Sequence, residues 1–381
     1  MAQIFRIWWP VFVAMLLVQM GNGLTGTLIS VTGESNNLSP LLQGLILSAF
    51  FGGSLAGAFS APLFIARTSH VTSLVAYTIA LSLATFCFAL TNDPLHWIVI
   101  RLVAGAAITG LFATIESWLN LGTQDVWRAR VFAIYIFVQL GGLASGQLLL
   151  NARSVGIDVL FIFAALLILS SAFLMRFERV QNPKFELTKY ISVFSLAARA
   201  PLGVLCVSLS GFAWAGLMAS GPAVAETMGL SDFEKSLFMA LAVFSGMAAQ
   251  LPIGWLADHF DRRIVLASLT AVAGAGALAA SLSPSLAVLF LFAFVFGAAT
   301  FPLYAVGVAC INEVLAQSER TSASAVMIVF FDFGAVIAPL LLAFATAMAG
   351  PRAYFVVQAL PQLAFAFATL LALRRRHSSL L

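Results

Sequence analysis

The residues most able to do chemistry in this sequence are ionisable side chains inside long apolar runs. Asp332 stands between Phe331 and Phe333, about eleven residues into such a run. In a helix that rises about 1.5 Å per residue, Asp332 would lie about 16 Å deep, near the middle of a bilayer. A carboxyl group at this depth can take up and release a proton or bind a cation. We interpret Asp332 as a proton-coupling or substrate-binding residue. The alternative is a neutral acid that packs helices through a hydrogen bond.

Two further ionisable residues share an earlier run. Arg101 lies several residues inside that run, where an unpaired guanidinium is costly, so it should face a central cavity or a carboxylate. The alternative is that Arg101 extends to the outer interface near Trp97. Glu116 follows fifteen positions later, about 60° around the helix and about 22 Å along it, so the two can share a face without touching. We consider Glu116 either a functional acid or an inner-end anchor paired with Arg128 or Arg130.

Uncharged polar residues form a weaker set of candidates. Asn22, Gln139 and Tyr304 lie in separate apolar runs and could line a cavity, although each is individually more typical of a hydrogen bond between helices. Enzyme signatures are absent, because the sequence has no phosphate-binding loop and its four His and three Cys show no metal-ligand spacing. We therefore expect no enzymatic activity, no cofactor and no bound metal.

The composition indicates which elements must position these residues. Of 381 residues, 61% are hydrophobic and only 9% are charged, and the mean hydropathy is +1.02. These values exclude a soluble enzyme, a nucleic-acid-binding protein and a secreted disulfide scaffold. The apolar runs are too long for the strands of a membrane barrel, so helices must span the bilayer. We predict an all-α membrane protein with twelve spans, at residues 8–29, 41–64, 71–90, 96–119, 130–150, 158–177, 200–224, 235–257, 264–282, 286–310, 321–346 and 353–373.

The basic residues divide unequally between the loops. If the N-terminus is cytoplasmic, fifteen Lys and Arg residues fall on that side, against Arg153, Lys235 and Arg352 on the other, with Arg101 inside a span. Positive charge favours cytoplasmic loops, so this bias predicts that both termini are cytoplasmic. We expect a multi-pass protein of the bacterial inner membrane.

A polar stretch divides the chain near its middle. Residues 177–199 contain Pro183 and mixed charge, between the sixth and seventh spans. We expect an N-terminal six-helix bundle over 1–178, a cytoplasmic linker over 179–199 and a C-terminal six-helix bundle over 200–381.

The two halves form an internal repeat. A shift of 192 residues aligns them without an insertion and matches Asn120 with Asn312 and Gly142 with Gly334. Because this shift contains an even number of spans, the halves share one orientation in the membrane, which is typical of transporters whose two halves enclose a central cavity. Asp332 and Glu116 have no acidic counterpart in the repeat, which marks both as functional candidates.

Short motifs carry a resemblance to a known family. Residues 254–263 read GWLADHFDRR and resemble the loop motif G-x-L-A-D-R-x-G-R-R of the major facilitator superfamily, with His259 for a basic residue and Asp261 for the second glycine. The matching first-half loop is degenerate, because Ala66 stands opposite Asp258 and His70 opposite Arg262. Residues 101–105, 116–117, 146–148 and 301–304 are also similar to segments of the superfamily, in particular of its uncharacterised YcaD-like branch.

The resemblance implies a fold of two pseudo-symmetric six-helix bundles and a conformational gate at the loop motif. In family members the carboxylate at the Asp258 position faces the start of the eleventh helix, here near Thr321, in the outward-open state, where the helix dipole favours an anion. Arg262 and Arg263 would add charge pairs at the same cytoplasmic seam. The alternative is a basic turn that serves topology alone. Arg101 matches a residue implicated in proton coupling elsewhere in the superfamily.

These features together predict a secondary transporter that works by alternating access and is coupled to protons. We expect efflux of a small organic or amphipathic compound, since Asp332 is flanked by aromatic residues. A proton symporter that imports a small organic nutrient is the alternative, and a non-transporting membrane sensor or assembly partner is an alternative of another class. The expected partners are a small-molecule substrate, protons and lipid, without nucleic acid, and the expected state is a monomer.

Overall fold

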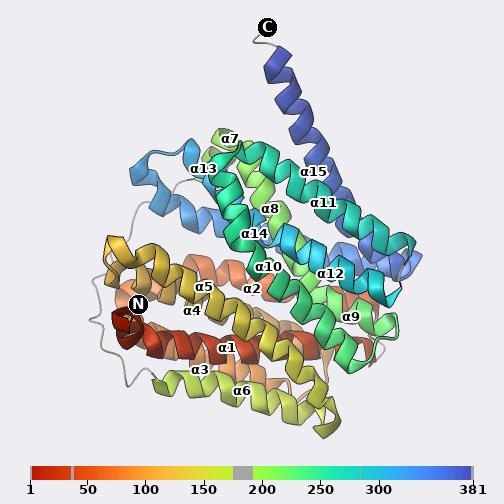
Figure 1. Cartoon of the computed structure of the whole chain (residues 1–381). Coiled ribbons are helices and arrows are strands. Elements are labelled where there is room, and N and C mark those ends of the chain that lie inside the picture. Colours follow the sequence, from red (N-terminus) through yellow and green to blue (C-terminus); the bar gives the residue numbers. More distant parts are fainter. Residues whose placement is uncertain (1, 36–37, 175–191, 284, 379–381) are drawn as a thin grey trace. The chain divides into compact units, whose positions relative to one another are not determined.

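The computed structural model describes residues 2–35, 38–174, 192–283 and 285–378, and helices make up nearly all of that part (Figure 1). Twelve helical stretches within it are long and apolar enough to cross a membrane. The predicted all-α fold with twelve spans is therefore confirmed. Long apolar runs fold this way because, in lipid, only a helix satisfies every backbone N–H and C=O within its own segment. The linker residues 179–191 lie outside the described residues.

The chain divides into two compact units. The first unit comprises Met1–Asn37, Leu45–Thr188 and Leu230–Ala240, and the second comprises Leu38–Gly44, Lys189–Gly229 and Leu241–Leu381. Two helices, α2 and α10, therefore contribute their first turns to one unit and their remaining residues to the other.

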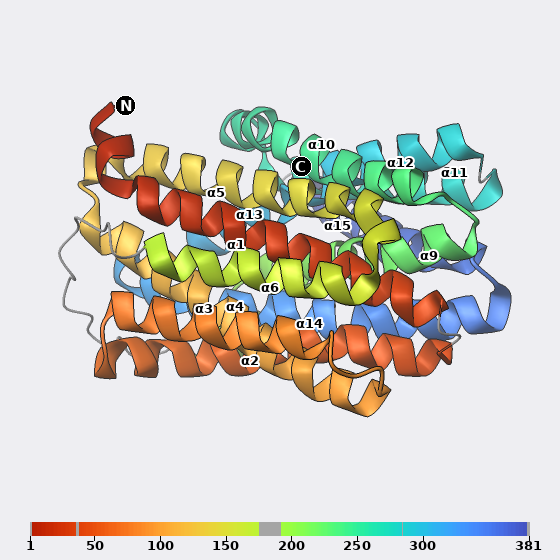
Figure 2. The same ribbon diagram turned by 90° about the horizontal axis from the view of Figure 1, so that it is seen from below.

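The first unit is built mainly from the first six spans. Their bounds are α1 (Ala2–Ser35), α2 (Pro40–Arg67), α3 (His70–Cys87), α4 (Pro94–Gly122), α5 (Asp125–Leu148) with the short helix η1 (Leu149–Val155), and α6 (Ile157–Leu174). Helix α1 packs against α5 and α6, and α3 packs against α4 and α6, as the neighbouring ribbons in Figure 2 show.

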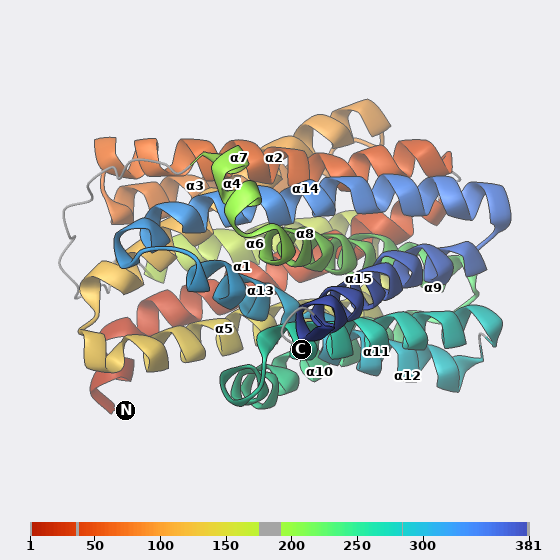
Figure 3. The ribbon, with the colours of Figure 1, turned by 90° about the horizontal axis from the view of Figure 1, so that it is seen from above.

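The second unit is built mainly from the remaining spans, which follow a short helix. Its elements are α7 (Val193–Arg199), α8 (Pro201–Ala215), the π-helical turn η3 (Gly216–Ser220), α9 (Gly221–Thr227), α10 (Asp232–His259), α11 (Arg262–Leu282), α12 (Leu286–Thr300), α13 (Leu303–Glu313), α14 (Gln317–Ala349) and α15 (Arg352–Ser378). Helix α8 packs against α13 and α14, while α11 packs against α12 and α15 (Figure 3).

Proline interrupts two of these spans. The seventh span changes from α8 to the π turn η3 shortly before Pro222, whose ring would clash with the carbonyl group of Met218, four residues earlier, in a regular helix. The tenth span breaks between α12 and α13 at Pro302 for the same reason. Proline thus accounts for a π turn in the seventh span and a break in the tenth span. The span prediction had treated both as continuous helices.

Candidate functional site

Asp332 lies in the buried part of α14. Its side chain is only 3% exposed. Close contacts between α8 and α14 hold the backbone before and after Asp332. A Cβ on Gly211 of α8 would lie 1.9 Å from the carbonyl oxygen of Phe331 in α14. A Cβ on Gly334 of α14 would lie 1.9 Å from the carbonyl oxygen of Ser208 in α8. The backbone on both sides of Asp332 is therefore fixed by direct helix contact. The carboxyl group does not lie on the exposed outer surface of the second unit.

Three aromatic rings from three helices meet at Phe331, the residue that precedes Asp332 in α14. Phe331 of α14 contacts Tyr304 of α13 edge to face, with 5.5 Å between ring centroids, and Trp214 of α8 at 6.1 Å. All three side chains are half-buried. These rings form a half-buried aromatic group one residue away from Asp332 in sequence, and such a group suits contact with an apolar or aromatic molecule. Tyr304 was a predicted site residue, whereas Trp214 was not singled out.

Arg101 of α4 is stacked on an aromatic ring in the first unit. Its guanidinium carbon lies 4.3 Å from the centroid of Phe50 in α2, and the side chain is 5% exposed. Its Nε has no hydrogen-bond partner among the described residues. The close crossing of α2 and α4 fixes this geometry, since a Cβ on Gly105 would lie 1.8 Å from the Phe50 carbonyl oxygen. A cation–π contact offsets part of the cost of burying the charge.

Glu116 of α4 has a partner that the sequence did not indicate. Tyr135 of α5 donates its hydroxyl proton to Glu116 Oε1 at 3.3 Å. One residue further along α4, the hydroxyl group of Ser117 lies 3.0 Å from His70 Nε2 of α3, and His70 stacks on Trp118. Glu116 therefore joins α4 to α5 through a polar contact. The next residue of α4, Ser117, joins α4 to α3. Whether this acid titrates during transport stays a prediction.

The remaining uncharged candidates lie on packed helices of the first unit. Asn22 of α1 donates from Nδ2 to Gln19 Oε1 at 3.2 Å, within its own helix. Gln139 is half-buried on α5, the helix that packs against α1. The structure thus puts Asn22 and Gln139 on neighbouring helices, and Asp332 and Tyr304 in the other unit.

The loop motif forms a charged network at the α10–α11 turn. Arg262 Nη1 donates to Glu313 Oε1 of α13 at 2.5 Å, and Arg262 Nη2 lies 3.8 Å from Asp258 Oδ1. Asp258 is 73% exposed. The predicted contact of Asp258 with the start of α14 concerns Thr321, whose side chain lies outside the described residues, and it stays a prediction.

Asp261, which replaces a motif glycine, has a capping role. Its Oδ1 accepts the backbone N–H of Arg263 at 2.9 Å, at the N-terminus of α11. The backbone at Asp261 has a φ of −57°, which a non-glycine residue adopts without strain. The departure from the motif therefore leaves the turn intact. Arg263 contributes this capped N–H, and a role for its side chain in the gate stays a prediction.

A second arginine holds the loop between α13 and α14. Arg199 of α7 donates to both carboxylate oxygens of Glu319, at 2.8 and 2.9 Å, and to the Val314 carbonyl oxygen at 3.1 Å. Glu319 also accepts the backbone N–H of Ala316, which caps α14. The pKa of Glu319 is lowered to about 2, mainly by the hydrogen bonds from the Arg199 guanidinium and secondly by the Ala316 N–H. Hydrogen bonding to Glu319 also raises the pKa of Arg199. The sequence analysis did not single out either residue.

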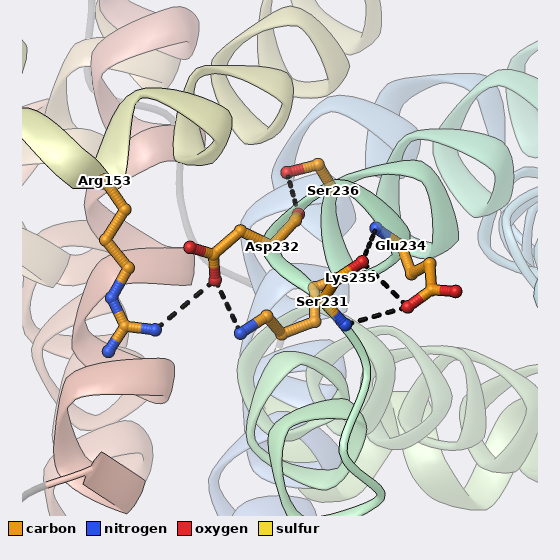
Figure 4. A network of polar contacts seen from close by, with 6 residues as sticks. All are labelled: Arg153, Ser231, Asp232, Glu234, Lys235 and Ser236. Atoms are coloured by element: carbon orange, nitrogen blue, oxygen red, sulfur yellow. Dashed lines mark hydrogen bonds and ion pairs between the residues drawn. The ribbon is translucent and has the colours of Figure 1, made fainter.

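A third network lies in the first unit, where α10 begins (Figure 4). Asp232 accepts from Lys235 Nζ at 2.7 Å and from Arg153 Nη1 of η1 at 3.4 Å, and Lys235 is only 3% exposed. Ser231 and Glu234 cap the helix reciprocally: the Ser231 N–H donates to Glu234 Oε2 at 2.8 Å, and the Glu234 N–H donates to Ser231 Oγ at 3.3 Å. The first turn of α10 is thus joined to η1 by charge.

Comparisons with known proteins agree with this architecture. Residues 203–380 match the family model described as Major Facilitator Superfamily, and residues 27–201 match one described as Transmembrane secretion effector. The "Uncharacterized MFS-type transporter YcaD" of Escherichia fergusonii is 25% identical over 96% of this chain and 95% of its own length. The one from Escherichia coli is 26% identical over 85% of both chains.

Solved structures share the fold at low identity. The nucleoside transporter NupG (D323A mutant) superposes with a TM-score of 0.79 at 14% identity, covering 94% of this chain and 97% of its own. A bacterial homolog of the human lysosomal transporter Spinster gives 0.74 at 15% identity, covering 94% of this chain and 96% of its own. With twelve apolar helices, two matching halves and the loop motif, the chain belongs to the major facilitator superfamily and is a multi-pass membrane transporter of that type.

Proposed function

We propose that this transporter exports a small amphipathic organic compound in exchange for protons, by alternating access. The observation that carries the proposal is Asp332, a carboxyl group 3% exposed in α14, which directly follows Phe331, the ring that contacts Tyr304 and Trp214. The rings suit the apolar part of a substrate, and the acid suits a proton or a cationic group that replaces it. Competition of substrate and proton for one carboxyl group is a direct way to couple their movements.

The charged α10–α11 turn supports the gating part of the proposal. Asp258, Arg262 and Glu313 form ion pairs that join α10, α11 and α13 at the predicted cytoplasmic end. Such contacts can differ between two states of a transporter and so set the balance between those states. We further propose that the protein acts as a monomer in the bacterial inner membrane, with both termini in the cytoplasm.

The test of coupling is the neutral variant Asp332→Asn. A panel of small aromatic compounds is first screened by thermal shift, and the compound that binds is used in proteoliposomes containing a pH-sensitive dye. We expect substrate addition to move protons in proteoliposomes with the wild-type protein and not in those with Asp332→Asn. Movement of substrate down its own concentration gradient should persist in Asp332→Asn.

A matched control separates coupling from general damage. Asp158→Asn makes the same chemical change at an exposed position of α6 and should retain the proton movement. If Asp332→Asn moves protons as the wild type does, Asp332 is not the coupling residue and the proposal fails.

The direction of the imposed gradient distinguishes import from export. A proton symporter would accumulate substrate on the side to which protons flow, whereas the proposed antiporter accumulates it on the opposite side. A non-transporting sensor would show neither, and cysteines placed near Asp332 would not change their accessibility when the compound is added.

A further inference from the structure

The buried face of α15 is polar along much of its length. Tyr354, Gln358, Gln362 and Thr369 are 0, 0, 0 and 2% exposed. Their spacings of four, four and seven residues place them on one side of the helix. This side belongs to the packed interior of the second unit, where α15 contacts α11, α14 and α8. A polar stripe inside a membrane protein needs hydrogen-bond partners, because lipid and apolar side chains offer none.

The described residues do not supply those partners for Gln362. Both its amide nitrogen and its amide oxygen are buried without a hydrogen bond to any described residue, and the hydroxyl group of Thr369 is in the same condition. A bond between Gln358 and Gln362 would not solve this. Each amide has two N–H donors and two acceptor lone pairs, so one bond between them leaves most of these groups unsatisfied.

Gln358 lies directly against the π turn of the seventh span. A Cβ on Gly216 would be 2.1 Å from Gln358 Nε2, so only glycine leaves room for the amide at this point. The neighbouring hydroxyl of Tyr354 donates its proton to the Gly216 carbonyl oxygen at 3.0 Å. That hydroxyl can therefore offer Gln358 only a lone pair, and the Gln358 oxygen still lacks a donor.

We propose that Gln358 and Gln362 bind internal water between α15 and the π turn Gly216–Ser220. A buried water molecule makes about three hydrogen bonds to groups that are otherwise unsatisfied, and two amides one helical turn apart provide both donors and acceptors for it. A larger ligand would need an opening, but both side chains are fully buried. Water is small enough to be enclosed with these side chains, and it both donates and accepts hydrogen bonds.

Hydration here has a mechanical consequence. A π turn disrupts the regular hydrogen-bond ladder, and Pro222 lacks the N–H that would continue it. Water held by the glutamines can exchange partners with the backbone of η3 as the turn changes shape. The seventh span can then bend at Gly216–Ser220 without leaving backbone groups unsatisfied in an apolar environment.

Radiolytic hydroxyl labelling of the full-length wild-type protein in detergent is the decisive test. Radicals formed from internal water modify neighbouring side chains even when bulk solvent cannot reach them. We expect Tyr354, which is 0% exposed, to be labelled several-fold more than Phe161, a ring that is 1% exposed and stacked on Phe88. Equal, background labelling of both rings would overturn the proposal, whatever the outcome of any transport assay.

Methionine variants keep the side-chain length and remove the amide. In Gln358→Met/Gln362→Met we expect the labelling of Tyr354 to fall to the level of Phe161. The single variant Gln362→Met should lower the Tm, because it leaves the bound water and Gln358 without a partner. A rise in Tm would mean that Gln362 is dry and unsatisfied in the wild type, since removing an unsatisfied buried group stabilises a protein, and would contradict the water site.

Discussion

The pair formed by Arg199 and Glu319 illustrates how two partly exposed side chains can fix a loop. Arg199 holds the Glu319 carboxylate through two hydrogen bonds and the Val314 carbonyl group through a third. Leu196 of α7, Leu315 of the loop and Met327 of α14 belong to one buried apolar cluster, so the same three segments also meet through apolar contacts. The ion pair therefore helps to fix the start of α14, the helix that carries Asp332.

The lowered pKa of Glu319 gives this pair a defined pH dependence. Its carboxylate has a pKa of about 2 in the folded protein, against an ordinary value of 4.5, so the stabilisation is fully present above about pH 5 and is lost as the pH falls towards 2. We expect the difference in Tm between wild type and Glu319→Gln to be positive and constant from pH 7 to 5 and to shrink below pH 4.5.

The partner variant provides the control for this prediction. Arg199→Met should lower the Tm at pH 7 in the same direction, and adding it to Glu319→Gln should change little, since the pair is already broken. A difference in Tm that stayed constant down to pH 3 would show that the Glu319 carboxylate is not held by Arg199.

At the scale of the elements, glycine decides how closely helices approach in the first unit. A Cβ on Gly146 of α5 would lie 2.1 Å from the Met20 carbonyl oxygen of α1, whereas one on Gly141 would meet nothing within 4 Å. These two glycines lie five residues apart in one helix, and α1 and α5 pack closely. They form a natural pair for comparison, because the same substitution has opposite consequences at the two positions.

We expect Gly146→Ala to destabilise the protein by about 1–3 kcal/mol, because the added methyl group must push two helix backbones apart. Gly141→Ala should be neutral or stabilising by up to about 1 kcal/mol, since alanine favours the helix at a position with open space. Thermal unfolding in detergent measures both. Equal Tm values for the two variants would contradict the close contact of α1 and α5.

The sequence predicts these elements much better than the contacts between them. Twelve spans follow from the length and hydropathy of local segments. Tyr135 was missed as the partner of Glu116 because their contact depends on how α4 and α5 pack. The aromatic group around Phe331 was equally hidden, because nothing in a chain with 34 Phe residues says which rings meet.

The irregular turns were missed for a different reason. Pro222 and Pro302 are visible in the sequence, but a proline in an apolar run can kink a helix, widen a turn or break the helix. The outcome depends on neighbouring side chains. At Gly216 the close approach of Gln358 and the bond from Tyr354 accompany the π turn, and both residues lie about 140 positions away in the chain.

At the scale of the whole molecule, the repeat preserves the helices but not their charges. In the second half, Arg262 joins Asp258 and Glu313 in ion pairs. The positions 192 residues earlier are His70, Ala66 and Leu121, which have no permanent charge. His70 instead bonds to Ser117 and stacks on Trp118. Two halves with one fold therefore use ion pairs at one turn and neutral packing at the matching turn.

The starts of α2 and α10 differ in the same way. Gly44 of α2 packs against α14, where an added Cβ would lie 2.8 Å from the Ala343 Cβ, so this contact is apolar. The matching contact of α10 is the network of Asp232, Arg153 and Lys235. Each of these contacts lies within one unit. The charged contact is the one that substitution of a single side chain can weaken selectively.

Asp232 should matter more than Arg153 for holding the first turns of α10. Arg153→Gln removes one contact between side chains that are 20 and 36% exposed, and pairs of this kind contribute about 0.2–1 kcal/mol, or at most about fivefold in an opening equilibrium. Asp232→Asn also removes a 2.7 Å ion pair from Lys235, which is 3% exposed, and loss of an ion pair from a buried charge is more costly. Hydrogen–deuterium exchange of residues 232–240 should therefore increase modestly in Arg153→Gln and strongly in Asp232→Asn, while residues 40–44 of α2 exchange as in the wild type. Equal exchange in the two variants would mean that the ion pair between Asp232 and Lys235 does not help to hold this turn. Faster exchange in α2 as well would mean that the two helix starts open together, and that the asymmetry of charge does not divide their roles.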